Sequence, residues 1–241
     1  MSHYKTPQLL IKLLKHLRKS SRGAEIIVVD SQAQKETRLL MQAEFPDIRY
    51  LPFTHNLGYA KIVNAGIAAA TRLYVLILNA DVLLGGQDIS RLLRFLKMHG
   101  DAAGVGASAC FRFPTLGAIF ARRTIWAKTP WGKKALQDYE MRDHAKTEPF
   151  VVDWVRGDCW MLSRKAIEKV GLLDERFFMY LEDTDWCRRA KNAGFHIYFL
   201  PGINVASRQE GASRKKNLRG VTYRFSHLIS FLNYLLKWTR Q

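Results

Sequence analysis

Two kinds of hydrophobic pattern alternate along the first hundred residues of the chain. Short, continuous, apolar runs predict strands that are buried on both faces, as in a parallel sheet. These runs cover residues 25–30, 48–51 and 73–78. Segments with apolar residues at helical spacing predict helices at residues 7–19, 35–44, 59–70 and 87–98. The alternation predicts a doubly wound α/β fold, with a mostly parallel, Rossmann-like sheet flanked by helices.

The pattern is less regular after residue 100. Glycine and proline recur between residues 100 and 150, which indicates a loop-rich region or a small subdomain. Residues 151–205 are ordered again, with helices predicted near 163–170 and 183–193 and a strand at 196–200.

The composition adds a marked positive charge to this picture. The 241 residues are 48% hydrophobic and 24% charged, so the chain can bury one large core. Lys and Arg number 38 against 21 Asp and Glu, a formal net charge of +17. This excess indicates an anionic partner: nucleic acid, an acidic membrane surface or a phosphate-bearing substrate. Nucleic acid ranks last, because no helix-turn-helix, RNP-like strand or zinc motif is visible.

The cysteines and the apolar runs indicate where in the cell the protein is located. Cys110, Cys159 and Cys187 are too few and too scattered for a disulfide framework, and no CxxC pair suggests zinc. No apolar run has the length of a membrane-spanning helix, and the basic N-terminus lacks the apolar core of a signal peptide. We therefore expect a cytoplasmic protein, with the inner face of the cell membrane as a peripheral site.

Two acids directly follow predicted strands. Asp81 closes the triplet Asn79-Ala80-Asp81, and Asp30 ends an earlier buried run. If the strands are parallel, both lie at the edge where α/β sheets place ligands. A carboxylate there suits a hard divalent cation, which in turn binds a diphosphate. The alternative is an ordinary turn, which Asn and Asp also favour.

A second acidic group lies in the segment 176–189. Glu182, Asp183 and Asp185 follow an aromatic cluster and precede two arginines. They could cap a helix and pair with the arginines. Helix capping does not require three acids beside large apolar residues, however, and a partly desolvated carboxylate in a cleft wall suits a general base.

With these motifs the sequence resembles a family 2 glycosyltransferase with the GT-A fold, and most closely a bacterial rhamnosyltransferase-like branch. The resemblance covers roughly residues 4 to 213. It rests on the segments 25–30, 56–64 (N-x-G-x-A-x-x-x-N), 75–82 and 152–157, and on the D-E-x-F-F-x-Y-x-E-D-x-D signature within 171–194.

The resemblance implies an inverting sugar transfer from a nucleoside diphosphate to an acceptor hydroxyl. It implies that Asp81 binds Mg²⁺ or Mn²⁺ and that Asp183 is the base, with Glu182 and Asp185 orienting the base or the acceptor. The donor, dTDP-rhamnose or a UDP-sugar, is expected to contact residues from several segments: Tyr4, Asp30, Asn56, Gly58, Lys61, Asn64, Asn79 and Asp81. The acceptor, a glycan or a polyprenyl-linked sugar, is expected near Gly157, Asp158 and Trp160.

Three departures from the family pattern matter. The chain begins where the family's first strand should end, so we expect that strand to be missing. The segment from Gly104 to Phe113 is short. Ser207 stands where the family often has a metal-binding histidine, so metal binding is expected to depend mainly on Asp81. These departures support an alternative hypothesis, a truncated and non-catalytic binding protein.

The C-terminal residues form a basic, amphipathic segment. Residues 208–241 contain eight basic residues and one acid, Glu210, and residues 223–238 have an apolar stripe at helical spacing. This helix could pack on the domain or lie on an anionic bilayer. We therefore divide the chain into a donor half (1–99), an acceptor and catalytic half (100–207) and a basic tail (208–241).

Overall fold

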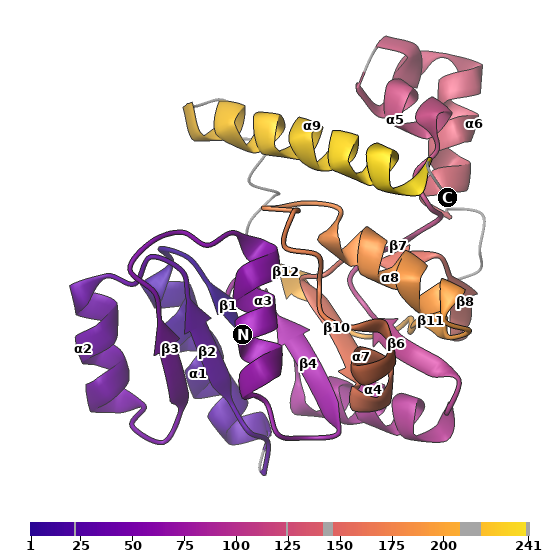
Figure 1. Cartoon of the computed structure of the whole chain (residues 1–241). Coiled ribbons are helices and arrows are strands. Elements are labelled where there is room, and N and C mark those ends of the chain that lie inside the picture. Colours follow the sequence, from indigo (N-terminus) through magenta and orange to yellow (C-terminus); the bar gives the residue numbers. More distant parts are fainter. Residues whose placement is uncertain (22, 124, 142–146, 208–217, 240–241) are drawn as a thin grey trace.

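The computed structural model describes the chain except for residues 22, 124, 142–146, 208–217 and 240–241. Figure 1 shows an α/β body beneath one long helix and a group of shorter helices. The strands are β1 (Ser2–His3), β2 (Ile27–Asp30), β3 (Arg49–Pro52), β4 (Tyr74–Leu78), β5 (Val82–Leu83), β6 (Ala102–Gly106), β7 (Cys110–Phe111), β8 (Phe150–Val152), β9 (Trp154–Val155), β10 (Cys159–Ser163), β11 (His196–Phe199) and β12 (Ala206–Ser207). The helices are α1 (Pro7–Ser20), α2 (Lys35–Glu44), α3 (Tyr59–Ala69), α4 (Gly86–Met98), α5 (Leu116–Arg123), the 3₁₀ helix η1 (Ile125–Lys128), α6 (Pro130–Tyr139), α7 (Arg164–Val170), α8 (Glu182–Asn192) and α9 (Leu218–Trp238).

The main strands form one row through the body. β3, β2 and β1 pair in parallel, and Ser2 bridges to Asn79 just past β4, which places β1 between β2 and β4. Beyond β4 the order is β10, β6, β11 and β8. β10 and β8 run antiparallel to their neighbours. The sheet is therefore mixed and largely parallel, and a strand from the second half of the chain separates β4 from β6.

Helices cover both faces of this row because successive side chains of a strand point to opposite sides. Val28 packs with residues of α1 and α2, whereas Ile27 and Val29 pack with α3. In β10, Met161 faces a cluster with α1 and α4, and Trp160 faces α7 and α8. The predicted α/β architecture is thus confirmed, with α1, α2 and α4 on one face and α3, α7 and α8 on the other.

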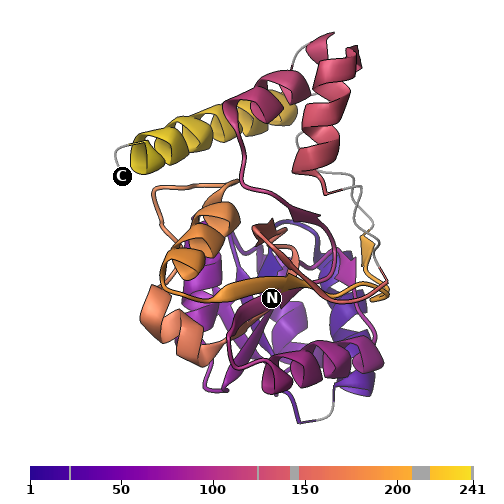
Figure 2. The same ribbon diagram turned by 90° about the vertical axis from the view of Figure 1, so that its right-hand side faces the viewer.

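One sequence-based expectation about this sheet needs correction. The first strand is not missing, since Ser2 and His3 form a short β1 that holds the central place beside β2. For the region from 100 to 150, the structure favours the second of the two alternatives, a small subdomain, over a loop-rich region. This region contains β6, which lies inside the sheet, and a group of helices, α5, η1 and α6, which Figure 2 shows beside α9 and away from the sheet.

Helix α9 is attached to the body through one of its faces. Tyr234 is buried against Phe177 and Leu181, and its hydroxyl oxygen accepts a hydrogen bond from Arg188 (3.1 Å). Lys237 forms ion pairs with Asp174 and Asp185, both at 2.8 Å. Of the two arrangements left open by the sequence, packing on the domain is therefore observed.

Two further expectations can be compared with the structure. Cys110, Cys159 and Cys187 are buried and unbridged, as small core thiols would be. Among the described residues, no helix is both long enough and apolar enough to cross a membrane.

We predict that Lys237→Met lowers the free energy of unfolding by about 2 kcal/mol, because it removes a charged partner from the buried Asp185 carboxylate. Chemical denaturation of the full chain measures this change. The matched control is Lys15→Met, which breaks an exposed pair with Glu44 and should cost at most about 1 kcal/mol. Equal effects of the two substitutions would contradict the anchoring of α9 through Asp185.

Candidate active site

The pairing of β10 with β4 brings two acids to one edge of the sheet. Cys159 lies opposite Leu78, so Asp158 lies opposite Asn79, whose amide donates to the Asp158 carbonyl oxygen (3.0 Å). Asp81 follows two residues later in the chain. Burial raises the pKa of Asp81, and the negative charge of Asp158 raises it further. The family resemblance predicts Asp158 on the acceptor side, whereas the register of the two strands puts it beside Asp81.

Asp158 is held by two polar side chains that the sequence did not single out. The Arg156 Nε donates to Asp158 Oδ2 (2.7 Å), and the Ser108 hydroxyl donates to Oδ1. Burial raises the pKa of Asp158, while Arg156 and Ser108 lower it. Arg156 is about half exposed, so its guanidinium offers a positive charge to solvent or to a ligand at the same edge.

Asp183 lies at the first turn of α8 and is almost fully buried. Its two carboxylate oxygens accept hydrogen bonds from the Gly157 amide (2.9 Å) and the Thr184 amide (2.7 Å). Burial raises the pKa of Asp183 to about 6, although both of these hydrogen bonds oppose the shift. The side chain is therefore ionised at neutral pH and is close to the pKa that suits a general base.

Glu182 differs from its neighbour in its hydrogen bonding. It is also buried, and its Oε2 atom has no hydrogen-bond partner within the described part of the chain. Burial, together with the charge of Asp183, holds the pKa of Glu182 well above its usual value. The protonated form of Glu182 is thus favoured beside the carboxylate of Asp183.

The chain turns sharply just before these two acids. Tyr180 and Leu181 both have left-handed backbone conformations, with φ of 75° and 69°. Such conformations are unfavourable for residues with large side chains, and they concentrate at functional sites. Leu181 and Phe177 are fixed beneath Tyr234 of α9, so packing holds this turn in place.

Tyr59 connects the two acidic groups. Its hydroxyl donates to the Gly157 carbonyl oxygen, and its amide donates to the Phe178 carbonyl oxygen (2.6 Å). Burial raises the pKa of Tyr59 well above its usual value, and the charges at four sites add to the shift: Glu182, Asp158, Asp183 and Asp81. All four acids therefore lie close enough to the Tyr59 hydroxyl to affect it electrostatically. Tyr59 lies within the 56–64 segment of the family resemblance, which is the one sequence signal that points to it.

Gly58 allows this close approach. It has a φ of 80°, and a Cβ built on it would come within 2.5 Å of the Phe178 carbonyl oxygen. Only glycine fits there without displacing the 174–181 segment. Asn56 supports the same loop, because its side-chain oxygen accepts hydrogen bonds from the Gly58 amide (3.0 Å) and the Ser31 hydroxyl (3.1 Å).

Three predicted site residues have structural contacts instead. The Asn64 side chain donates to the Leu173 carbonyl oxygen and accepts from the Leu173 amide (2.9 Å each). It therefore links α3 to the segment after α7 and does not point to a donor. Trp160 is fully buried and packs edge-on against Trp186, with 5.5 Å between ring centroids, so it lies in the core and not in an acceptor cleft.

Asp185 is the third of these residues. It points away from Asp183 because two residues of a helix are about 200° apart around its axis. It is fully buried and accepts hydrogen bonds from Arg189, Lys237 and Trp238 at 2.9–3.0 Å. Its carboxylate therefore holds α9 and does not orient the base or the acceptor.

Asp30 is near the strand ends but is turned into the protein. Its carboxylate accepts hydrogen bonds from the Tyr50 hydroxyl (2.6 Å) and from His3 Nδ1 (2.7 Å). The Thr6 amide donates to His3 Nε2 (3.0 Å), which places the imidazole proton on Nδ1. Both carboxylate oxygens of Asp30 are therefore already bonded within the protein, and neither is directed toward a nucleotide base in this structure.

The other predicted donor contacts are distributed around the same edge. The Asn79 side chain accepts a hydrogen bond from the Ser2 hydroxyl (2.6 Å), and Tyr4 lies beside Gln32, with 3.4 Å between its hydroxyl and Gln32 Oε1. Lys61 is exposed on α3. These residues remain predicted contacts.

The residues present fit a divalent cation only as a partial site. Asp81 and Asp158 supply hard oxygen ligands, and Mg²⁺ is commonly held by one or two carboxylates together with substrate phosphates. No group of three or more His, Cys, Asp and Glu side chains that could hold a metal occurs among the described residues. Ser207 pairs with Val82, next to Asp81, at the position expected from the family pattern.

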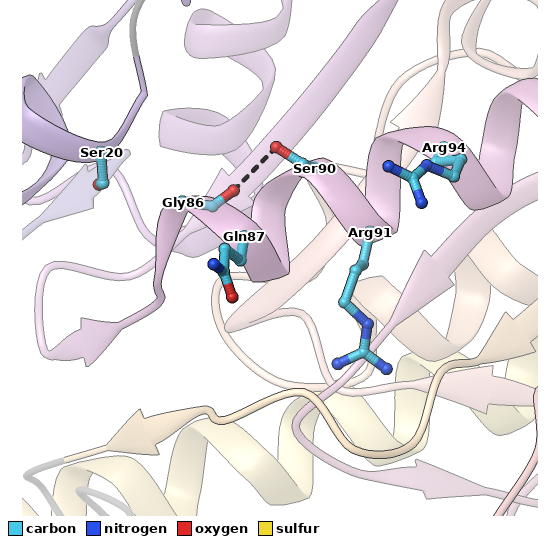
Figure 3. Close-up of a pocket in the computed structure, with 6 residues that line it drawn as sticks. All are labelled: Ser20, Gly86, Gln87, Ser90, Arg91 and Arg94. Carbon is cyan, nitrogen blue, oxygen red and sulfur yellow. Dashed lines mark hydrogen bonds between the residues drawn. The ribbon is translucent and has the colours of Figure 1, made fainter.

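A hollow on another part of the surface is not this site. It lies between the end of α1 and the start of α4 and is lined by Ser20, Gly86, Gln87, Ser90, Arg91 and Arg94 (Figure 3). None of these residues belongs to the predicted site. The Arg91 guanidinium donates to the Gly202 carbonyl oxygen (2.6 Å) and pairs with Asp88, so it is engaged within the protein.

Comparisons with known proteins agree with this geometry. The chain is 27% identical over 210 residues to N-acetylglucosaminyl-diphospho-decaprenol L-rhamnosyltransferase of Mycobacterium tuberculosis, covering 77% of this chain and 67% of the relative. It is 24% identical over 214 residues to rhamnosyltransferase WbbL of Escherichia coli, covering 80% and 76%.

Solved structures show the same fold. A mannosyltransferase of Pyrobaculum calidifontis in complex with GDP-Man and Mn²⁺ superposes with a TM-score of 0.61 at 15% identity, covering 96% of this chain and 62% of that one. GalNAc-T7 with UDP, GalNAc and Mn²⁺ also gives 0.61, at 14% identity, covering 83% and 41%. The chain thus spans less than two thirds of the length of either protein. Their likeness confirms the predicted GT-A fold.

The family itself follows from the sequence match. Residues 1–171, well over half of the chain, match the sequence model of glycosyl transferase family 2. With that match, and with the acids of two predicted motifs assembled around one tyrosine, this chain belongs to glycosyl transferase family 2.

Proposed function

We propose that this protein is an inverting transferase that moves a sugar from a nucleoside diphosphate to a hydroxyl of a cell-surface glycan or a lipid-linked acceptor. We propose dTDP-rhamnose first as the donor and a UDP-sugar second. Support comes from the names of the two rhamnosyltransferase relatives, one of which refers to a diphospho-decaprenol acceptor. We propose a cytoplasmic location, in keeping with the buried and unbridged cysteines.

The observation that carries the proposal is the state of Asp183. It is a buried carboxylate with a pKa of about 6, and it is fixed by amide hydrogen bonds from Gly157 and Thr184. A hydroxyl is a poor nucleophile, so an acceptor requires such a base on the face of the sugar opposite the leaving group.

The residues of the site then have distinct tasks. Asp183 takes the proton of the acceptor hydroxyl as its oxygen forms a bond to the anomeric carbon. The bond between that carbon and the diphosphate oxygen breaks, and its electron pair leaves with the diphosphate. Because attack and departure are on opposite faces, the anomeric centre is inverted.

Glu182 and Arg156 act on the two ends of this displacement. The neutral Glu182 can donate a hydrogen bond from its unpartnered buried oxygen, which suits it to position the acceptor. The half-exposed Arg156 places positive charge where the diphosphate develops negative charge. Asp81 and Asp158 would hold a divalent cation, whose charge offsets that of the same leaving group.

We predict that UDP or dTDP binds this chain in the presence of Mn²⁺ and that Asp81→Ala weakens this binding at least about tenfold, with Asp158→Asn having a similar effect. Isothermal titration calorimetry, with and without Mn²⁺, measures the affinities. Asp47→Ala, on the exposed surface near α2, is the control and should bind as the wild type does. Absence of nucleotide binding by the folded wild type would instead support the non-catalytic alternative.

We predict that Asp183→Asn lowers the rate of sugar transfer by about 10²- to 10⁴-fold while nucleotide affinity is kept, because the amide cannot accept the proton. Glu182→Gln is the matched control. Since burial and the charge of Asp183 favour the protonated form of Glu182, a neutral isostere should cost far less than Asp183→Asn in the same transfer assay. The reverse order of the two effects would assign the base to Glu182.

The pH dependence gives a separate test of the base. The raised pKa means that Asp183 is ionised and active above about pH 6 and protonated and inactive below it. We therefore predict that kcat/KM falls about tenfold per pH unit below pH 6. Carbon-13 NMR of the labelled aspartate carboxyl groups, assigned with Asp183→Asn, should show the same titration. A midpoint near 4 would contradict the role of burial.

A further inference from the structure

Helix α9 has a second face, directly opposite the one that is attached to the body. Ser230 and Tyr234 point inward and are buried, and Ser230 donates to the Met179 carbonyl oxygen (2.8 Å). Successive residues of a helix are about 100° apart, so side chains two positions away from these point outward. The outward set is apolar and 43–64% exposed: Phe225, Leu228, Ile229, Leu232 and Leu236.

A second apolar group lies on the neighbouring helices. Large apolar side chains of α5, η1 and α6 are 49–83% exposed: Leu116, Phe120, Ile125, Trp126 and Trp131. Figures 1 and 2 both place α5, α6 and α9 together on the side of the molecule away from the sheet. We call these two groups together the outer face. Exposed apolar patches of this extent usually mark a contact surface.

The charge of these segments indicates what the outer face contacts. The helices α5, η1 and α6 (residues 116–139) contain five basic residues and one acid, Asp138, and α9 (residues 218–238) contains three basic residues and no acid. Lys128, Lys133 and Lys134 are exposed on η1 and α6. Apolar side chains that include tryptophan, in segments with an excess of positive charge, are typical of a surface that enters the headgroup region of an anionic bilayer.

We propose that the outer face binds an anionic lipid bilayer, with α9 lying along the membrane surface and α5–η1–α6 inserted beside it. The inner face of α9 stays on the protein through Tyr234 and the ion pairs of Lys237. Because α9 also contacts the 174–181 segment that leads into Glu182 and Asp183, binding holds the site close to the membrane. Only this last consequence depends on the proposed function.

The test is sedimentation of the full chain with vesicles, without donor or acceptor. Vesicles of phosphatidylcholine with about one third phosphatidylglycerol should bind the protein and shift tryptophan emission to shorter wavelength, while pure phosphatidylcholine binds it weakly. Ile229→Gln with Leu232→Gln should weaken binding at least about tenfold. Lys133→Gln with Lys134→Gln should weaken it about fivefold per lysine and reduce its salt dependence.

The matched control is Leu39→Gln with Leu73→Gln, which removes two exposed leucines that lie outside the outer face. This variant should bind vesicles as the wild type does, and all variants should keep their nucleotide affinity if the proposed function holds. Failure of vesicle binding with intact nucleotide binding overturns this inference alone. Self-association that the Ile229 and Leu232 changes abolish would assign the face to a second copy. Binding to RNA that depends on the lysines but not on the apolar residues would assign it to nucleic acid.

Discussion

The antiparallel pairing of β10 with β4 is the contact on which the site depends. It is made by five residue pairs in the middle of the sheet, from Cys159 with Leu78 to Ser163 with Tyr74. Because β10 begins at this edge, Gly157 and Asp158, which directly precede it, are held at fixed positions. Asp158 then lies beside Asp81, and the Gly157 amide and carbonyl groups bind Asp183 and Tyr59. A shift of one residue would move all of these groups at once.

The site places four acids near one partly buried tyrosine, Tyr59, and such a cluster cannot carry four full charges at low cost. The structure reduces that charge in different ways at each position. Burial favours the protonated form of Glu182, Asp158 pairs with Arg156, and Asp183 receives two amide hydrogen bonds. Asp81 is only partly buried, which leaves its oxygen atoms available to a cation. Asp183 and Asp81 are the same type of residue. Their different proposed roles, as a base and as a cation ligand, therefore follow from burial and hydrogen bonding.

Helix α9 links this site to the outer surface. Its inner face covers the strained turn at Tyr180 and Leu181, and its Lys237 neutralises Asp185, two residues after the base. The third acid of the E-D-x-D motif therefore stabilises the position of α8. An amphipathic helix with one face on the protein and the other exposed also explains why the sequence fitted both packing and surface binding.

The amino-acid sequence alone predicts most strands and helices of the first hundred residues, because buried runs and helical spacing are local patterns. It also shows that Asp81 follows a strand and that Glu182 and Asp183 lie together after an aromatic cluster, which made these residues candidates for the site. Which acids lie close together depends on the tertiary structure. In the folded chain, Asp158 lies beside Asp81, and Tyr59 and Arg156 belong to the site. The side chains of Asn64, Trp160 and Asp185 make packing contacts within the protein. These outcomes depend on strand register, on helix faces and on partners distant in sequence, such as Asp185 and Lys237, which no local pattern specifies.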